Sequence, residues 1–369
     1  MATNFWESSH CNSWLLDEAT LRQARAIDSQ YADGRELALI GIFFANVIAK
    51  LGKRLNLRQQ VIATATVYFR RFYVKSSYCE TDPFFVSSAC CYLAAKAEEA
   101  PVYLKAVVQE SRVLLSGYGI KTFPTDNTKL AEMEWYLLED LDFHLIVFHP
   151  YRSLATLCGK LGIIDLAEQG EVGAEPDEER YWGTGEGVMN FDDGCVQMAW
   201  FVINDSYRGE LCLQYPPYLI AIAALYLSVL LHGNTRQRLS ESFEDPATIR
   251  RTRSTGSAGP VVSTRDRLLD FLAGVNVSLE TISRICQHML SMYALWDILT
   301  DGSDGDEKRR HDRKLPGTAT GLIPLGDRRN VYTEKAIVEK LFQMREKRES
   351  DLAHPADARP PDNKLMERA

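Results

Sequence analysis

Apolar residues recur every three to four positions through most of the chain, which is the spacing of one face of an α-helix. Short polar segments divide this pattern into two sets of five blocks. The first set covers residues 36–54, 57–74, 82–99, 104–116 and 129–143, and the second covers residues 151–161, 195–213, 217–231, 264–274 and 278–296. The sequence therefore predicts an all-α protein built from two consecutive five-helix units.

One block in each set follows the same template, which indicates an internal repeat. PFFVSSACCYL at 83–93 and PYLIAIAALYL at 217–227 both begin with proline, carry apolar residues at helical spacing and end in Tyr-Leu. Asp82 before Pro83 fits a helix N-cap followed by proline at the first helical position. We therefore expect the two halves of the chain to be copies of one helical unit.

The segments outside the two sets differ from them in composition. Residues 1–35 combine aromatic and charged side chains and are expected to form an N-terminal helix that packs on the body or on a partner. An acidic insertion near 168–194 and an arginine-rich insertion near 234–265 are expected to be surface loops. The predicted domains are the arm at 1–35, the first unit at 36–146, the second unit at 147–298 and a polar tail at 299–369. The tail contains a basic cluster at 308–314 and one possible amphipathic helix at 334–347.

Composition narrows the classes of function. The 369 residues are 46% hydrophobic, which is enough for two cores, and a net charge of −8 argues against direct binding to a nucleic-acid backbone. The longest apolar run, at 218–231, is too short to span a bilayer, so we expect a core helix there and no membrane contact. The eight cysteines form no CxxC pair and no metal-ligand spacing, so they are expected to be buried free thiols. The sequence predicts neither a metal nor a cofactor.

Two charged residues interrupt apolar stripes in the first set. Lys96 follows Leu93 on the apolar face of its helix, whereas the repeat-equivalent residue is Leu230. Glu134 shares a face with Leu137. Each charge is costly to bury alone, so we expect the two to pair, and a partly buried pair is suited to binding a partner's backbone groups. The structural alternatives are that Lys96 snorkels from a helix end and that Glu134 lies just off the buried face.

Three further carboxylates stand out. Glu98 and Glu99 adjoin Lys96, and they either belong to the same surface or form a solvated helix end. Asp205 interrupts the stripe that contains Met198 and Val202. It either faces a partner or serves as an internal cap.

These residues lie in motifs that resemble the cyclin family and its tandem cyclin boxes. The two most general motifs are LxxKxEE at 93–99 and MEWYLLEDLDF at 133–143. Longer stretches resemble the branch of this family that belongs to the Mediator kinase module: NFWESSH at 4–10, LRQQVIATATVYFRRFY at 57–73, VFHPYR at 147–152 and VINDSYRGELCLQYPP at 202–217. The likeness extends over roughly residues 1–296 apart from the two insertions.

The resemblance implies a nuclear regulatory subunit that is not itself an enzyme. Such a subunit binds and activates a cyclin-dependent kinase of the Mediator kinase module, contacts other Mediator subunits, and regulates RNA polymerase II transcription as an activator or repressor. In the family, the Lys and Glu matched by Lys96 and Glu134 contact the kinase around its mobile regulatory helix. Glu99 and Asp205 are expected to hold arginines of the kinase activation segment through charge-assisted hydrogen bonds. The predicted kinase-binding residues are Lys96, Glu98, Glu99, Glu134, Phe5, Trp6, Trp14 and Asp205.

Two other classes of function are weighed against this one. A general transcription factor of the transcription factor IIB type uses the same repeated helical fold to bind DNA, but that class has a zinc ribbon and a basic face, and this sequence has neither. An all-helical enzyme needs converging catalytic groups. The seven histidines of the chain show no triad spacing.

Overall fold

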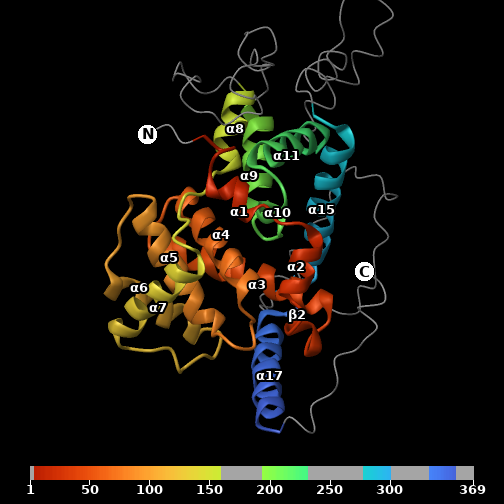
Figure 1. Cartoon of the computed structure of the whole chain (residues 1–369). Coiled ribbons are helices and arrows are strands. Elements are labelled where there is room, and N and C mark those ends of the chain that lie inside the picture. The colour runs from red at the N-terminus through yellow and green to blue at the C-terminus, as the bar shows by residue number, and fades with distance from the viewer. Residues whose placement is uncertain (1–3, 159–192, 232–276, 301–331, 355–369) are drawn as a thin grey trace, which may run out of the picture. The chain divides into compact units, whose positions relative to one another are not determined.

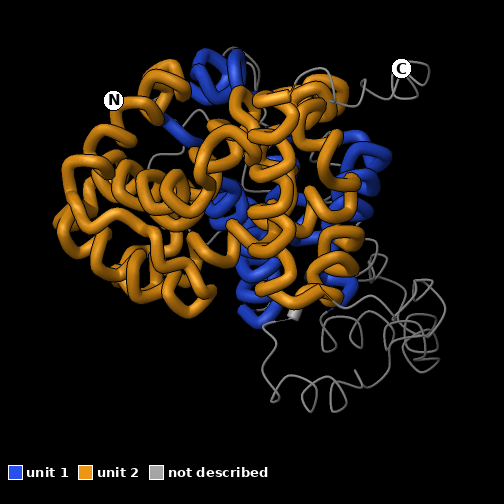
Figure 2. Tube along the Cα trace, turned by 90° about the horizontal axis from the view of Figure 1, so that it is seen from below, with its two compact units in different colours: residues 1–15, 146–207, 214–289 blue, residues 16–145, 208–213, 290–369 orange. Residues whose placement is uncertain are grey.

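The computed structural model describes residues 4–158, 193–231, 277–300 and 332–354. The two insertions, the expected helix at 264–274 and the basic cluster at 308–314 lie outside these residues. The chain divides into two compact units, shown in different colours in Figure 2. Unit 1 comprises residues 1–15, 146–207 and 214–289, and unit 2 comprises residues 16–145, 208–213 and 290–369.

Unit 2 contains the first five-helix set, in the order that the sequence predicts (Figure 1). Its helices are α3 (Gly34–Arg54), α4 (Gln59–Lys75), α5 (Pro83–Ala97), α6 (Leu104–Ser116) and α7 (Asn127–Asp140). The start of α3 is fixed by a capping box, because Asp33 accepts from the backbone N–H of Glu36 and Glu36 accepts in return from that of Asp33. The start of α5 is fixed by the predicted Asp82 cap and by proline at the first helical position.

The core of unit 2 forms where α3, α4 and α5 pack against one another. Phe44 of α3 stacks on Phe69 of α4 at 5.1 Å and meets Phe84 of α5 edge-on at 5.0 Å between ring centroids. Aromatic pairs in these geometries add to the stabilisation that burial alone provides. The interior position of α5 explains why both of its cysteines, Cys90 and Cys91, are fully buried. All eight cysteines are free, seven are buried and Cys11 is half-buried, so this prediction is confirmed.

The segment before α3 contains two short helices in place of the single N-terminal helix that the sequence suggested. These are α1 (Ser9–Trp14), which belongs to unit 1, and α2 (Glu18–Ala24), which belongs to unit 2 together with the 3-10 helix η1 (Asp28–Gln30). Asp17 separates the two helices. Its side-chain oxygen accepts from the backbone N–H of Thr20 at 2.8 Å, and this N-cap starts the second helix.

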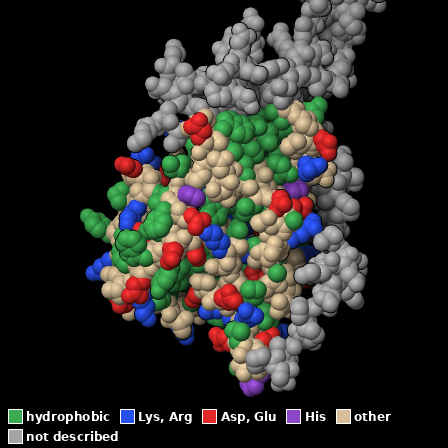
Figure 3. Space-filling view, viewed as in Figure 1, with side chains coloured by type: hydrophobic (Ala, Val, Ile, Leu, Met, Phe, Trp, Pro, Cys, Tyr) green, Lys and Arg blue, Asp and Glu red, His purple; other side chains and the backbone are tan. Residues whose placement is uncertain are grey.

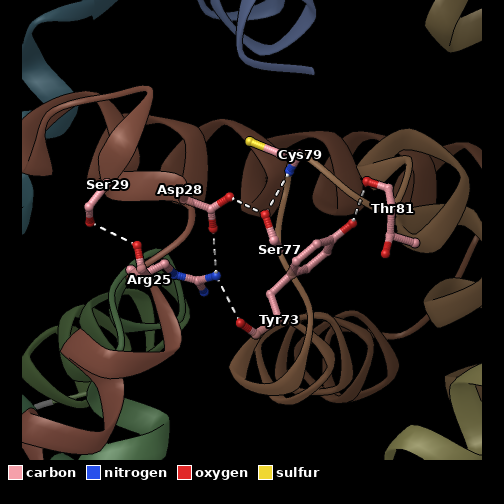
Figure 4. A network of polar contacts seen from close by, with 7 residues as sticks. All are labelled: Arg25, Asp28, Ser29, Tyr73, Ser77, Cys79 and Thr81. Atoms are coloured by element: carbon pink, nitrogen blue, oxygen red, sulfur yellow. Dashed lines mark hydrogen bonds and ion pairs between the residues drawn. The ribbon is translucent and has the colours of Figure 1, made fainter. Parts of the chain in front are cut away.

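A buried polar network ties η1 to the end of α4 (Figure 4). The Asp28 carboxylate is fully buried, accepts from the Ser77 hydroxyl at 2.6 Å and lies 3.6 Å from the Arg25 guanidinium. Arg25 also donates to the Tyr73 carbonyl at 2.8 Å and lies over the ring of Tyr78. Because a buried carboxylate is costly unless it is paired, this network fixes the entry of the chain into unit 2.

Unit 1 is built around the second copy of the repeated helix. Helix α11 (Pro217–Leu231) packs against α8 (Pro150–Leu157) and α9 (Asp193–Ser206). Helices α5 and α11 both begin at the proline of the template and both have 15 residues, as an internal repeat requires. The last helix of the second set, α15, covers Leu279–Asp297. No helix within the described part of the chain is long and apolar enough to cross a membrane.

The block predicted at 195–213 is interrupted. Helix α9 ends at Ser206 and the short α10 (Leu211–Gln214) follows, with the turn containing Gly209, a poor helix former, between them. Arg208 fixes this turn in unit 2: its side chain donates to Asn46 at 2.9 Å and lies 3.7 Å above the Trp296 ring.

The C-terminal region contributes one more helix to unit 2. Strand β2 (Tyr332–Thr333) pairs in parallel with β1 (Leu299–Thr300), and α17 (Glu334–Ala353) follows and packs on α3 (Figure 1). The amphipathic pattern at 334–347 thus corresponds to a helix that is six residues longer. Within the stretch that the sequence assigned to a polar tail, this helix is part of the packed unit.

Candidate functional site

Lys96 and Glu134 form the pair that the sequence predicts. Lys96 lies in the last turn of α5 and Glu134 in the middle of α7, and the Lys96 Nζ donates to Glu134 Oε1 at 2.6 Å. The Glu134 side chain is 9% exposed, whereas that of Lys96 is 48% exposed. Glu134 therefore belongs to the buried stripe of α7, and Lys96 reaches it from the rim.

The surroundings of Lys96 favour its charged form. The hydrogen bond that Lys96 donates to Glu134 raises the pKa of Lys96, and the ammonium also lies 5.3 Å from the centre of the Tyr92 ring, within cation–π range. The result is an ammonium held at a defined position on the surface. Lysine has three N–H donors, so an ammonium held in this way can bond to Glu134 and to the backbone carbonyl of a partner together.

The two glutamates after Lys96 have different environments. Both Glu98 oxygens bond within the chain, one accepting from the Thr64 hydroxyl at 2.6 Å and the other from the Gln60 amide at 2.9 Å. Glu98 therefore joins α5 to α4, and its contact with a partner remains a prediction. Glu99 is exposed and has a positive φ of 54° directly after the helix. Its side chain remains available to the candidate site.

The segment that follows α7 presents an aromatic residue that the sequence reasoning missed. Asp142 and Phe143 have φ values of 51° and 59°, a backbone conformation that residues other than glycine rarely adopt. The Phe143 side chain is 64% exposed. Two successive left-handed residues end the helical periodicity, so the helical pattern does not predict the direction of the Phe143 side chain. In the sequence, the one sign of its exposure is that Phe143 does not continue the apolar stripe of Leu137 and Leu141.

Polar side chains of α4 hold this strained segment. They are spaced three and four residues apart and so lie on one face of α4. Tyr68 donates to the Leu145 carbonyl at 2.5 Å, Arg71 donates to the His144 carbonyl at 3.1 Å, and Lys75 forms an ion pair with Asp142 at 2.6 Å. Strain of this kind persists only where the surroundings impose it, so the exposure of Phe143 is a built feature of unit 2.

Further aromatic side chains are exposed on the same unit. Tyr103 at the start of α6 is 88% exposed, and Trp135 and Tyr136 on α7 are 68% and 65% exposed. Figure 3 shows hydrophobic side chains gathered on the face over α5, α6 and α7. Exposed aromatic residues are enriched at protein–protein interfaces relative to the rest of a protein surface.

The N-terminal aromatic residues belong to unit 1, and two of them are interior. Phe5 is 2% exposed and Trp14 is 3% exposed. The Phe5 ring lies 5.4 Å from that of Phe148, and Trp6, which is 36% exposed, packs at 6.0 Å on Tyr218. The expectation that Phe5 and Trp14 contact a partner directly is therefore corrected, because both side chains are enclosed by their own unit. Only Trp6 has an exposed face.

Asp205 is half-buried on α9 in unit 1. It is engaged within the chain, as expected for the alternative of an internal contact. Next to it, Asn204 accepts from the Tyr151 hydroxyl at 2.8 Å. A role for Asp205 in binding a partner remains a prediction.

Histidines and metal ligands give no support to the enzyme alternative. His10 accepts from the backbone N–H of Phe148 at 3.1 Å, and His149 lies 2.5 Å from the Tyr207 hydroxyl. Both are buried residues with structural partners. Over the described ranges, no three His, Cys, Asp or Glu side chains come together in a way that could hold a metal ion.

Comparison with known proteins places the chain in a family. The family model described as "Cyclin, N-terminal domain" matches residues 29–146, which contain the Lys96–Glu134 pair. The RNA polymerase II holoenzyme cyclin-like subunit of Mycosarcoma maydis is 33% identical over 404 residues, covering 94% of this chain and 99% of the relative. The chain therefore belongs to the cyclin family, and the resemblance inferred from its motifs is confirmed.

A second relative is itself named as a cyclin. Cyclin-C of Drosophila melanogaster is 33% identical over 326 residues, covering 86% of this chain and 97% of the relative. Among solved structures, a chain in the CAK complex of Chaetomium thermophilum is similar with a TM-score of 0.48 at 15% identity, covering 97% of each chain.

Proposed function

We propose that this cyclin is the regulatory subunit of a cyclin-dependent kinase of the Mediator kinase module, that it acts in the nucleus, and that it regulates RNA polymerase II transcription. Two comparisons support the proposal: one relative is named an RNA polymerase II holoenzyme cyclin-like subunit, and another is named Cyclin-C. Other Mediator subunits are proposed as further partners.

The Lys96–Glu134 pair is the observation that carries the proposal. A half-exposed ammonium fixed at 2.6 Å by a buried carboxylate is oriented before a partner arrives. Little side-chain entropy is then lost on binding, which favours affinity. Backbone carbonyls at one end of a kinase helix and N–H groups at the other are the partner groups that such a pair can bind. Glu99 is proposed to bind an arginine of the kinase, and Trp6 and Asp205 are proposed as additional contacts.

Phe143, Tyr103 and Trp135 are proposed as the apolar part of the same interface. Aromatic side chains contribute most of the binding energy where they enter a pocket on the partner, while charged pairs nearby set orientation. The strained backbone that exposes Phe143 is understandable on this basis, because it keeps a large apolar side chain at the surface of the free subunit.

The proposed mechanism is a population shift in the kinase. Active kinases need an ion pair between a β-strand lysine and a glutamate on a mobile helix, together with a magnesium-binding aspartate. A cyclin that binds only the conformation with this helix turned inward makes that conformation the dominant one. The cyclin supplies no catalytic group. The shift in free energy between the two kinase conformations equals the difference in the cyclin's binding free energy for them.

The test exchanges the two charges. A Lys96→Glu, Glu134→Lys double variant keeps an ion pair inside unit 2 but reverses the polarity that a partner meets. We expect wild type to co-purify kinase activity toward a polymerase C-terminal-domain peptide from nuclear extract and the exchanged variant to lose at least nine-tenths of it. The matched control is Arg54→Glu, Glu110→Arg, which reverses a pair of similar length, 2.7 Å, between α3 and α6.

Each outcome decides a separate point. If the exchanged variant folds and retains kinase like the control, the pair is not the docking site. If wild type co-purifies no kinase, the proposed function fails. If wild type binds kinase but the bound kinase has low activity per molecule, the cyclin tethers the kinase without activating it.

A further inference from the structure

Helices α3, α5, α6 and α7 of unit 2 end in the same way. After each helix, one residue has a positive φ, and the backbone N–H of the next residue donates to a carbonyl five positions earlier. These bonds join Leu57 to Gly52, Ala100 to Ala95, Ile120 to Leu115 and Phe143 to Leu138, at 2.9 to 3.1 Å. The left-handed residues are Asn56, Glu99, Gly119 and Asp142, with φ values of 54°, 54°, 83° and 51°. One left-handed residue is therefore enough to end a helix in this unit.

Helix α7 differs from the other three because a second left-handed residue follows the first. Phe143 has a φ of 59° directly after Asp142. The bond that closes the end of α7 uses the Phe143 N–H, and rotation about the next bond, which sets φ of Phe143, does not move that N–H. An aromatic side chain in this conformation brings its Cβ close to the following carbonyl, which is unfavourable. The conformation of Phe143 is thus not required for ending the helix, and other contacts must impose it.

The contacts that impose it come from one face of α4 and hold the chain on both sides of Phe143. Before it, the Lys75 Nζ donates to Asp142 Oδ2 at 2.6 Å. After it, the His144 carbonyl accepts from Arg71 and the Leu145 carbonyl accepts from Tyr68. The Phe143 side chain, between these contacts, is 64% exposed.

The contacts differ in how much of the fold depends on them. Tyr68 and Arg71 are fully buried, so they belong to the core of unit 2. The side chains of Lys75 and Asp142 are 41% and 55% exposed. The hydrogen bond from Lys75 lowers the pKa of the Asp142 carboxyl, so the pair is charged at neutral pH. Because exposed ion pairs add little to global stability, this pair can be removed while the unit stays folded.

From these observations we propose that Lys75 and Asp142 are positioning residues for the kinase: they fix the backbone at Phe143 so that its ring meets the partner in one orientation. The inference rests on the proposed function, in which Phe143 enters the interface. Neither Lys75 nor Asp142 touches the partner, and each acts through Phe143. A ring that is held in its bound orientation before the partner arrives loses little entropy on binding.

The first test needs no kinase. It measures hydrogen exchange at the amides of Phe143, His144 and Leu145, which bond to carbonyls within the same segment or at the end of α7. In the full chain with Lys75→Met, these amides should exchange about five-fold faster, the upper end of what an exposed ion pair contributes. Lys75→Arg restores the pair and should restore the wild-type rate. Unchanged exchange in Lys75→Met overturns the proposal.

The matched control for Lys75→Met is Arg54→Met. The Arg54–Glu110 pair is 2.7 Å long and the Arg54 side chain is 40% exposed, close to the values for Lys75, but it joins α3 to α6. Methionine, lysine and arginine have similar helix propensities, so both substitutions leave their helices intact. Arg54→Met should leave exchange at Phe143, His144 and Leu145 at the wild-type rate. Equal acceleration by both variants means a general loosening of the unit and also overturns the proposal.

The second test follows the kinase that the immobilised chain collects from nuclear extract, measured as activity retained during washing. We expect Lys75→Met to release the kinase about five-fold faster than wild type, and Lys75→Arg and Arg54→Met to release it at the wild-type rate. Phe143→Ala should also speed release, and adding Lys75→Met to it should have no further effect, because the two residues act through one contact. If Lys75→Met has its full effect in the Phe143→Ala chain, Lys75 contacts the partner itself and the proposal is overturned.

Failure of this proposal and failure of the proposed function give different results. If wild type collects no kinase, the proposed function fails and the positioning role fails with it. If wild type collects kinase and Lys75→Met releases it at the wild-type rate, the positioning role alone fails.

Discussion

Removing Lys96 should destabilise unit 2 more than altering Glu134, although the two residues form one ion pair. In Lys96→Met the Glu134 carboxylate loses its cation while it remains 9% exposed. In Glu134→Gln the amide oxygen still accepts a hydrogen bond, and a lysine that is already 48% exposed can turn to water. The burial of the residue left behind decides the cost, not the length of the bond that is lost.

The expected loss of stability lies between the values for a fully exposed and a fully buried ion pair. Exposed ion pairs contribute about 0–1 kcal/mol, and breaking a buried pair by removing one partner costs about 3–5 kcal/mol. With one partner buried and the other half-exposed, Lys96→Met should cost about 2 kcal/mol and Glu134→Gln less than about 1 kcal/mol. Methionine and lysine have similar helix propensities, so the helix itself contributes little to the difference.

Urea unfolding of both variants measures this asymmetry, with the shift in midpoint read at a common m-value. Arg54→Met is the matched control, because the Arg54–Glu110 pair is 2.7 Å long with side chains 40% and 30% exposed. It should cost no more than about 1 kcal/mol. The reasoning is refuted if Lys96→Met is as mild as Arg54→Met, or if Glu134→Gln costs more than Lys96→Met.

Three further predictions concern the packing that positions the site. Asp28→Ala should destabilise unit 2 by about 3–5 kcal/mol, because it removes the buried partner of Arg25, and thermal unfolding measures this. Gly52→Ala should be destabilising by about 1–2 kcal/mol, because the added Cβ meets Ile62 at 2.5 Å and this overpacking exceeds the gain in helix propensity. In the folded chain at pH 8, only Cys11 should react with a thiol reagent within minutes, because seven of the eight thiols are buried, whereas all eight should react in urea.

The controls for these predictions lie close by in the chain. Ser29→Ala removes only an exposed hydroxyl that donates to the Arg25 carbonyl and should leave stability within about 0.5 kcal/mol of wild type. Gly34→Ala adds a Cβ with nothing within 4 Å and should not be destabilising. For the thiols, burial raises the pKa of Cys91 to about 12, so fast labelling of that residue in the folded chain contradicts the packing of α5.

The sequence predicted the helices of unit 2 because their determinants are local. Asp82 and Pro83 start α5, and the three- to four-residue spacing of apolar side chains defines its faces. The pairing of Lys96 with Glu134 was predictable for a similar reason, since each charge stands alone in an apolar stripe and must find a partner.

What the sequence did not predict depends on contacts between distant residues. The carboxylate of Glu98 was expected either on the partner-binding surface or at a solvated helix end, and its bond to Thr64, 34 positions earlier, was not predicted. Phe5 and Trp14 were expected at an interface, because apolar character alone does not say whether the cover comes from the same chain or from a partner. Phe143 emerges from two left-handed residues that no periodicity can foresee. The packing of α17 rests on pairs such as Arg348 with Glu80, 268 positions apart.

The repeat makes it possible to separate scaffold from function within this cyclin. Helices α5 and α11 share their starting proline, their length and their central place in a unit, so those features serve the fold in both copies. At the fourteenth position the copies differ: α5 has Lys96, paired with a buried carboxylate, and α11 has Leu230, which is 46% exposed. A scaffold requirement would keep the two positions alike. On the basis of this difference, Lys96 and Glu134 are proposed to be present for a partner, and the exchange of their charges tests whether they form the docking site.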